Sequence, residues 1–201
     1  IVIADDFYPP YSKSPNATTV FCKGNTAAEM VDAILKLSRL ENRSTPMKKE
    51  VLEVGDLISG IIATHEVYVS DSGLKLIYEV ERGVRVRGDA DMIRQATANL
   101  ISNAVRYTPE GGTITVRVRH GEIMADIVVE DTGIGMSAEF LEHLFEPYTR
   151  ETAFSAHPSV GTGLGMPIVK NLVQQMAGTI SVESELGKGT TFTVKIQRNT
   201  I

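Results

Sequence analysis

The chain has 201 residues, of which 42% are hydrophobic and 22% are charged, and its formal net charge is −5. This composition is typical of one or two folded domains, and the acidic balance argues against nucleic acid as the main partner, because nucleic-acid-binding chains are usually basic. The single cysteine, Cys22, excludes an internal disulfide, and since there is neither a signal peptide nor an apolar run of about 18 residues, we expect a cytoplasmic protein or the cytoplasmic portion of a membrane receptor.

The first 45 residues contain one clear element. Residues 1–23 include Pro9, Pro10 and Pro15, which disfavour a regular helix, so we interpret this segment as a linker or an added strand. Residues 24–43 predict an amphipathic helix, because apolar side chains recur on one face at Met30, Val31, Ile34, Leu37 and Leu40. That face is suited either to cover the following domain or to pair with a partner helix in a dimer.

From residue 54 onward, helices and strands are predicted in a mixed order. Helical spacing predicts helices at Val54–Glu66, after a cap at Asp89, over Ser137–Leu144 and after the glycines near residue 163. Apolar runs and alternation predict strands at Leu74–Val80, Val84–Arg87, Thr113–Arg119, Met124–Glu130, Thr179–Glu183 and Thr190–Ile196. Without repeats or regular βαβ alternation, this order favours an α+β fold with a layer of helices on one face of a mixed sheet.

A glycine-rich stretch, Val160–Met176, precedes the last predicted helix. Gly161, Gly163 and Gly165 alternate with larger residues, and Pro167 falls where a first helical turn tolerates proline. Free N–H groups and the positive end of the helix dipole make such a start a phosphate site. An ordinary turn is the alternative, whereas a dinucleotide fold is disfavoured because a polar loop, not a strand, precedes the glycines.

Two further patterns carry chemistry. Asn99 and Asn103 lie four residues apart on one helix face, and a carboxamide oxygen is a hard, neutral ligand for Mg²⁺; a solvated polar face is the alternative. Asp131 ends an apolar strand and is followed by Gly133 and Gly135. A carboxylate at such a bend can accept a hydrogen bond from an adenine amino group, although it would equally cap an ordinary turn.

Together these segments resemble a known family. Asn99–Tyr107, Asp131–Gly135, Phe145–Glu146–Pro147 and Gly161–Gly165 have the order and spacing of the N, G1, F and G2 boxes of sensor histidine kinases. The resemblance implies a Bergerat ATP-binding fold, a two-layer α/β sandwich with a preceding amphipathic helix. It implies a catalytic ATP-binding domain over residues 50–198, and it identifies residues 24–45 as part of the second helix of a dimerisation hairpin.

The resemblance also implies roles for individual residues. Asn103 would bind Mg²⁺, Asn99 would support the phosphate region, and Asp131 would bind the adenine amino group, with Gly133 and Gly135 shaping that wall. Further residues expected around ATP are Arg106 and Tyr107 at phosphate or ribose, Phe145 at the base of the ATP lid, Arg150 in the lid, Gly161, Thr162, Gly163, Leu164 and Gly165 at the phosphates, and Thr191 on the adenine side. Of these, Asn99, Arg106 and Arg150 would serve catalysis; the family usually has lysine where Arg106 stands.

Asn99 distinguishes between relatives of the same fold. Gyrase-type and mismatch-repair ATPases carry a glutamate there that activates water, which an amide cannot do, so ATP would be held for transfer to a protein nucleophile. The expected partners are a phosphoacceptor hairpin of the same or the partner subunit and a response regulator receiver domain, in a homodimeric full-length protein. His65-Glu66 is a decoy for the acceptor. The alternatives are a degenerate nucleotide-gated module without transferase activity and an anti-sigma-type serine kinase.

Overall fold

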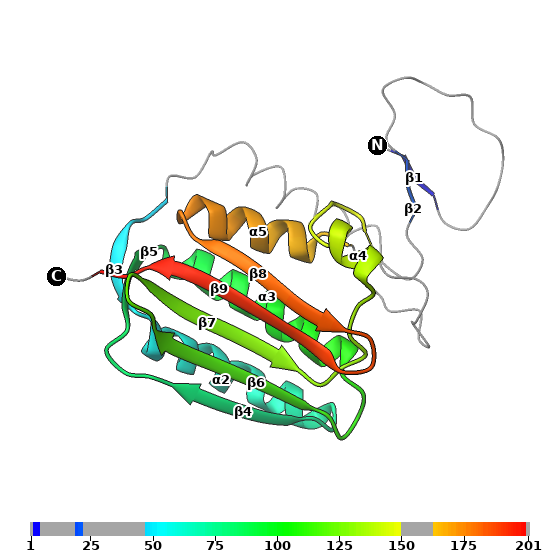
Figure 1. Ribbon diagram of the computed structural model, residues 1–201, viewed down its shortest axis with the longest axis horizontal. Coiled ribbons are helices and arrows are strands. Elements are labelled where there is room, and N and C mark those ends of the chain that lie inside the picture. Colours follow the sequence, from blue (N-terminus) through cyan, green and yellow to red (C-terminus); the bar gives the residue numbers. More distant parts are fainter. Residues whose placement is uncertain (1, 5–18, 22–46, 150–162, 200–201) are drawn as a thin grey trace.

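A five-stranded mixed sheet forms one layer of the molecule. The computed structural model describes residues 2–4, 19–21, 47–149 and 163–199. The strand order is β4-β6-β7-β9-β8, in which β4 pairs parallel with β6 and every other pair is antiparallel (Figure 1). The strands span Lys75–Val80 (β4), Thr113–His120 (β6), Met124–Asp131 (β7), Thr179–Glu185 (β8) and Gly189–Gln197 (β9).

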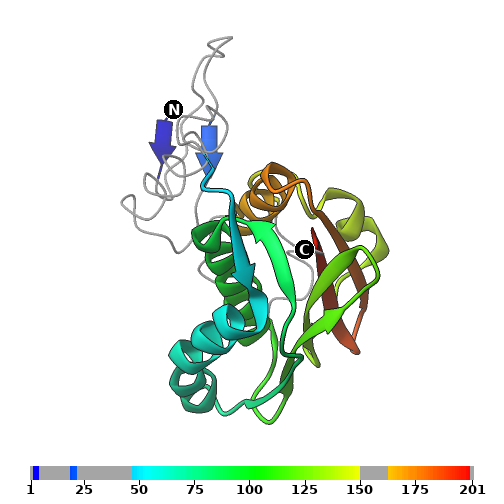
Figure 2. The same cartoon turned by 90° about the vertical axis from the view of Figure 1, so that its left-hand side faces the viewer.

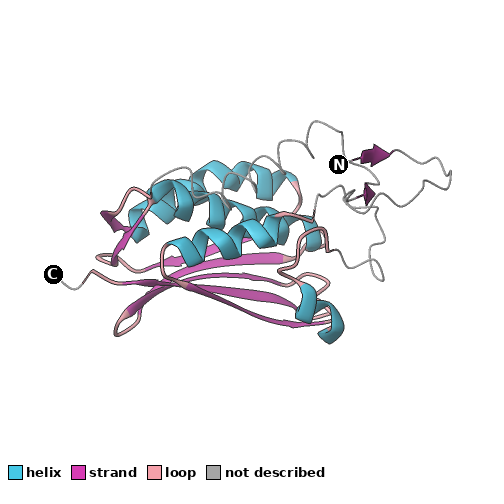
Figure 3. Cartoon of the chain, turned by 90° about the horizontal axis from the view of Figure 1, so that it is seen from above, coloured by secondary structure: helices cyan, strands magenta, loops and turns pink. Residues whose placement is uncertain are grey.

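Three helices form the second layer, and all of them cover the same face of the sheet (Figure 3). They are α2 (Val54–Asp71), α3 (Ala90–Tyr107) and α5 (Gly165–Gln175), while the short α4 (Ala138–His143) follows β7. Apolar side chains fill the space between the layers, and the largest fully buried ones are Ile58, Ile93, Leu100, Ile101, Ile114, Ile127, Leu164, Leu172 and Ile196. The predicted two-layer sandwich with helices on one face of a mixed sheet is therefore confirmed.

Two smaller strand pairs lie outside the main sheet. Strand β3 (Glu50–Glu53), which the sequence did not predict, pairs antiparallel with β5 (Arg85–Gly88), as Figure 2 shows beside α2 and α3. Strand β1 (Val2–Ala4) pairs parallel with β2 (Thr19–Phe21). The helix predicted over residues 24–43 lies outside the described residues. None of the helices that the structure describes has the length and apolar character needed to cross a membrane.

Candidate functional site

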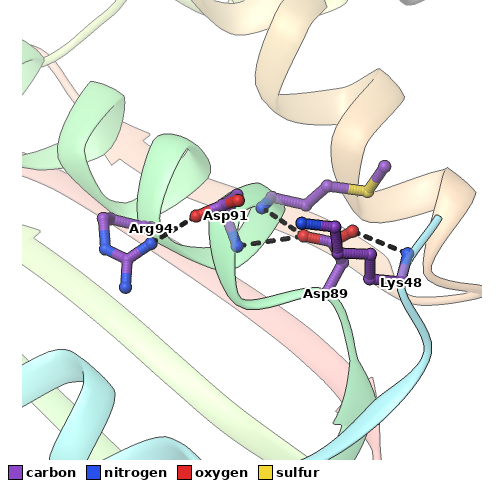
Figure 4. A network of polar contacts seen from close by, with 5 residues as sticks. Lys48, Asp89, Asp91 and Arg94 are labelled. Carbon is purple, nitrogen blue, oxygen red and sulfur yellow. Dashed lines mark hydrogen bonds and ion pairs between the residues drawn. The ribbon is translucent and has the colours of Figure 1, made fainter. Parts of the chain in front are cut away.

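Helix α3 begins at a carboxylate that makes three hydrogen bonds. Oδ1 of Asp89 accepts hydrogen bonds from the backbone N–H groups of Asp91 at 3.0 Å and Met92 at 3.2 Å, which confirms the predicted N-cap. Its other oxygen, Oδ2, accepts the N–H of Lys48 at 2.9 Å (Figure 4). The side chain of Asp89 thus joins the start of α3 to the segment through which the chain enters the domain.

Asn99 and Asn103 lie half-buried on α3, which packs against α5. Nδ2 of Asn103 lies 3.3 Å from Sδ of Met166, the second residue of α5. A Cβ atom at Gly165 would lie 4.0 Å from the same nitrogen, an ordinary van der Waals distance, so Gly165 and Asn103 are neighbours across the two helices. One turn further along α3, Arg106 and Tyr107 are exposed. The structure therefore brings the predicted amide face to the start of the helix that follows the glycines.

The start of α5 has the geometry expected of an anion-binding helix terminus. Gly163 has a φ of +67°, and a Cβ there would come within 2.9 Å of the Tyr148 backbone, so this position requires glycine. Leu164 is fully buried at the N-cap position and has no polar side chain with which to cap the helix. Pro167 lies in the first turn as predicted. Backbone N–H groups in the first turn of a helix point out of its N-terminal end, where they can bind an anion.

Asp131 ends β7 as a buried carboxyl group with 7% of its surface exposed. Its Oδ1 accepts the N–H of Gly133 at 2.8 Å, and the carboxyl group also accepts a backbone hydrogen bond from Thr190. Burial raises the pKa of Asp131 to about 6, and the neighbouring charge of Glu130 acts in the same direction, while the two hydrogen bonds act against it. A perturbed carboxyl group at the end of a strand is a candidate ligand-binding group.

The two glycines after Asp131 fit closely against neighbouring backbone. A Cβ at Gly133 would lie 2.5 Å from the carbonyl oxygen of Tyr107, and one at Gly135 would collide with the carbonyl oxygen of Glu185. Gly135 also has a φ of +66°. The N–H of Ile134 donates to the carbonyl oxygen of Tyr107 at 3.0 Å, so the C-terminal end of α3 holds the loop that follows Asp131.

The hydroxyl beside Asp131 belongs to Thr190, whereas the sequence had suggested Thr191. In the ladder between β7 and β9, Asp131 lies opposite Thr190, and Thr191 lies opposite Glu130. Side chains alternate along a strand, so Thr191 faces away from the helices while Thr190 is buried on their side. Oγ of Ser184 contacts Oγ1 of Thr190 at 2.9 Å and accepts the N–H of Met136 at 2.9 Å. The sequence analysis did not identify Thr190 or Ser184. The alternation of buried residues in β9, which runs through Phe192 and Val194, indicates that Thr190 is on the buried face.

The remaining predicted residues divide into two groups. Phe145 is half-buried with Nζ of Lys170 5.2 Å from its ring centroid, and the N–H of Tyr148 donates to the carbonyl oxygen of Gly163 at 3.0 Å. These contacts connect the segment after α4 to the start of α5. Arg150, Gly161 and Thr162 lie outside the described residues. His65 lies within α2, where its Nδ1 contacts the carbonyl oxygen of Ile61 at 2.9 Å.

Comparison with known proteins places this geometry in context. Residues 88–200 match the family described as histidine kinase-, DNA gyrase B-, and HSP90-like ATPase. The sensor-like histidine kinase SenX3 of Mycolicibacterium smegmatis is 32% identical over 182 residues, which are 90% of this chain and 47% of SenX3. The sensor histidine kinase CusS of Escherichia coli is 32% identical over 84% of this chain and 35% of its own length. The chain thus spans less than half of the length of these relatives.

Solved structures share the fold. The histidine kinase AdeS of Acinetobacter baumannii has a TM-score of 0.69 at 24% identity, and the match covers 86% of this chain and 79% of the AdeS chain. Full-length ShkA, solved in complex with AMPPNP, has a TM-score of 0.75 at 23% identity over 86% of this chain and 36% of the ShkA chain. The predicted ATP-binding sandwich is confirmed at the level of the fold.

Proposed function

The chain belongs to the histidine kinase-, DNA gyrase B- and HSP90-like ATPase family, and on this premise we propose that it is the ATP-binding catalytic part of a sensor histidine kinase. In this proposal it holds Mg–ATP for phosphoryl transfer to a histidine on a dimerisation hairpin of the same or the partner subunit, and a response regulator receiver domain then receives the phosphoryl group. The identities of SenX3 and CusS as sensor kinases support this reading over the other members of the family.

One observation carries the proposal: the C-terminal half of α3 contacts both the loop after the buried carboxyl group of Asp131 and, through the half-buried amide of Asn103, the first turn of α5. Ile134 bonds to the end of α3, which fixes the loop after Asp131, and Asn103 contacts the first turn of α5. A purine at Asp131 would therefore extend its phosphates toward Asn103 and α5. This arrangement matches the adenine and phosphate ends of a nucleotide.

The residues at the site have distinct chemical tasks. The carboxylate of Asp131 accepts the adenine amino N–H, the N–H groups of the first turn of α5 bind phosphate oxygens, and Arg106 adds positive charge at the exposed edge. Oδ1 of Asn103 would be the protein ligand of Mg²⁺, which when bound neutralises charge on the phosphates. Asn99 cannot accept a proton, so the site lacks a general base at that position and retains ATP for transfer. Catalysis then consists of positioning and charge stabilisation.

Calorimetric titration with ADP and with AMPPNP, each with and without Mg²⁺, tests the proposal. We expect magnesium-dependent binding.

Asn103→Asp is expected to disturb Mg²⁺–AMPPNP binding because a new charge enters the phosphate region, and unchanged affinity would refute the metal assignment. Asp131→Asn is expected to weaken ADP and AMPPNP alike, because both carry adenine; loss of only one of them would refute the adenine role. Asp71→Asn, at the exposed end of α2, is the matched control.

Transfer is tested separately by adding a dimerisation hairpin with its phosphoacceptor histidine. Radiolabel from ATP is expected on the histidine, as an acid-labile phosphoramidate. Nucleotide binding without any transfer would favour the degenerate, nucleotide-gated module instead, and an acid-stable phosphoserine on a protein substrate would favour the serine kinase.

A further inference from the structure

We propose that Met166 is a positioning residue for Asn103: its thioether sulfur accepts the amide N–H and thereby presents Oδ1 of Asn103 to the divalent cation. The inference rests on the proposed function, because it assumes that Asn103 is the metal ligand. Met166 itself touches neither nucleotide nor cation in this proposal. It acts only through the orientation of the amide.

The chemistry of the contact fixes which way the amide faces. A thioether sulfur carries no hydrogen and can only accept a hydrogen bond, so the atom of Asn103 that lies 3.3 Å from Sδ must be the nitrogen. The oxygen in that place would put two acceptors against each other. Since Nδ2 and Oδ1 occupy opposite branches of the planar amide, a nitrogen held against α5 leaves the oxygen directed elsewhere.

The surroundings of the pair make the contact specific. Met166 is 8% exposed and occupies the second position of α5, while Asn103 is half-buried on the facing side of α3. Gly165, directly before it, brings its backbone near the same Nδ2, with the Cβ position 4.0 Å away. The amide therefore has its nitrogen side against two consecutive residues of α5, and of these two Met166 carries the side-chain acceptor.

An amide without such a partner has two orientations that fill the same space. In one of them the oxygen is available to a cation, and in the other the site presents N–H donors, which repel a cation. The apparent affinity for the cation falls with the fraction of molecules in the competent orientation. A single neutral hydrogen bond biases this equilibrium by roughly two- to tenfold, which sets the size of the expected effect.

The same residue links metal binding to the position of α5. Met166 is the second residue of α5, the helix whose first N–H groups are expected to bind phosphate. A nucleotide that draws α5 closer to α3 therefore also tightens the contact between Met166 and Asn103. The cation and the phosphates are then bound cooperatively through one side chain. Removal of the sulfur is expected to weaken nucleotide binding in the presence of Mg²⁺ while leaving binding in its absence nearly unchanged.

Met166→Leu removes the acceptor while conserving volume, a change that buried sites usually tolerate. Met176→Leu is the matched control, because Met176 is a buried methionine at the opposite end of α5, with its sulfur near Gly88. ADP affinity is measured by calorimetry with Mg²⁺ and with EDTA for the wild-type chain and both variants. The informative quantity is the ratio of the two affinities, because a general disturbance of α5 lowers both affinities together.

We expect the ratio to fall roughly two- to tenfold in Met166→Leu and to stay at the wild-type value in Met176→Leu. An unchanged ratio in Met166→Leu, with a wild-type chain that binds ADP in a magnesium-dependent way, would overturn the inference and leave the proposed function intact. A wild-type chain without magnesium-dependent binding would overturn both.

A measurement on the wild-type chain keeps the test independent of the variant's folding. With methyl-labelled methionine, a nuclear Overhauser contact between the Met166 methyl group and the Nδ2 protons of Asn103 is expected without nucleotide. Its absence would contradict the proposed contact. In Met166→Leu the chemical shifts of these two side-chain protons are expected to move, while those of Asn99 stay in place.

Discussion

Replacement of Asp131 by asparagine is expected to stabilise the nucleotide-free chain at neutral pH. The folded-state pKa of Asp131 is about 6, against an ordinary value of 3.8, because burial penalises the charged form. Below pH 3.8 both the folded and the unfolded chain carry the protonated group, so this carboxyl group costs nothing there. As the pH rises, the unfolded chain loses the proton first, and stability falls until the folded chain has lost it too, above pH 6.

The size of this loss follows from the difference between the two pKa values. A difference of about 2.2 units corresponds to about 3 kcal/mol, since each unit is worth 1.36 kcal/mol. With 7% of its surface exposed, the group gains little screening from solvent. Part of this loss has already occurred at pH 4, so we expect the free energy of unfolding of the wild-type chain to fall relative to Asp131→Asn by about 2 kcal/mol between pH 4 and pH 7, and to stay level above that.

Urea unfolding of both chains at half-unit steps from pH 4 to pH 8 measures this difference directly. Comparison with the variant removes the contribution of the other titrating groups, and Asp71→Asn controls for the loss of an exposed carboxyl group. A difference between wild type and Asp131→Asn that stays constant over this range would refute the reasoning. Nucleotide binding gives a second readout: if the carboxylate accepts the adenine amino group, adenosine affinity is expected to fall below pH 6 in the wild type.

Two further changes test the frame of the site, each by urea unfolding. Gly135→Ala is expected to lower the free energy of unfolding by about 2–5 kcal/mol, because the new Cβ collides with Glu185 and the backbone has a positive φ. Gly187→Ala is expected to lower it by only about 1–2 kcal/mol, because Gly187 has a φ of +78° but open space around it. Asp89→Ala is expected to lower the free energy of unfolding by about 2 kcal/mol, because it removes the cap and the bond to Lys48, and Asp89→Asn by about half of that, because asparagine still caps. Equal losses in the two variants would show that the cap contributes nothing, and no loss in Asp89→Asn would show that the Lys48 bond contributes nothing.

Local signals predicted most elements of the fold. Asp89 and Ser137 both stand where their side chains accept hydrogen bonds at helix starts, and the five strands of the main sheet were predicted from apolar runs and alternation. The helix predicted to end at Glu66 continues to Asp71, although Val67, Tyr68 and Val69 are weak helix formers. Val69 is fully buried, so tertiary packing stabilises this last turn against local preference.

The missed features depend on contacts distant in sequence. Strand β3 is four residues long, contains two glutamates, and forms because Arg85–Gly88 offers it a partner. The contact between Asn103 and Met166 joins residues that are 63 positions apart, so no local sequence pattern predicts it. Unlike these two features, the position of Thr190 could have been found from the sequence. The register of β9 places Thr190 opposite Asp131, and the alternation of apolar residues along β9 already indicates which of the two threonines is buried.

Helix α3 explains how distant motifs become one site. Asn103 and Tyr107 lie one helical turn apart, so the amide near α5 and the carbonyl group that holds the loop after Asp131 are fixed by the same rigid element. A shift of α3 along its axis would move both ends of the proposed nucleotide site together. Because Asp89 bonds both α3 and Lys48, the segment entering the domain is attached to that element at its first turn. In the proposed site, α3 therefore links the adenine end to the phosphate end, and Lys48 is attached to the same helix.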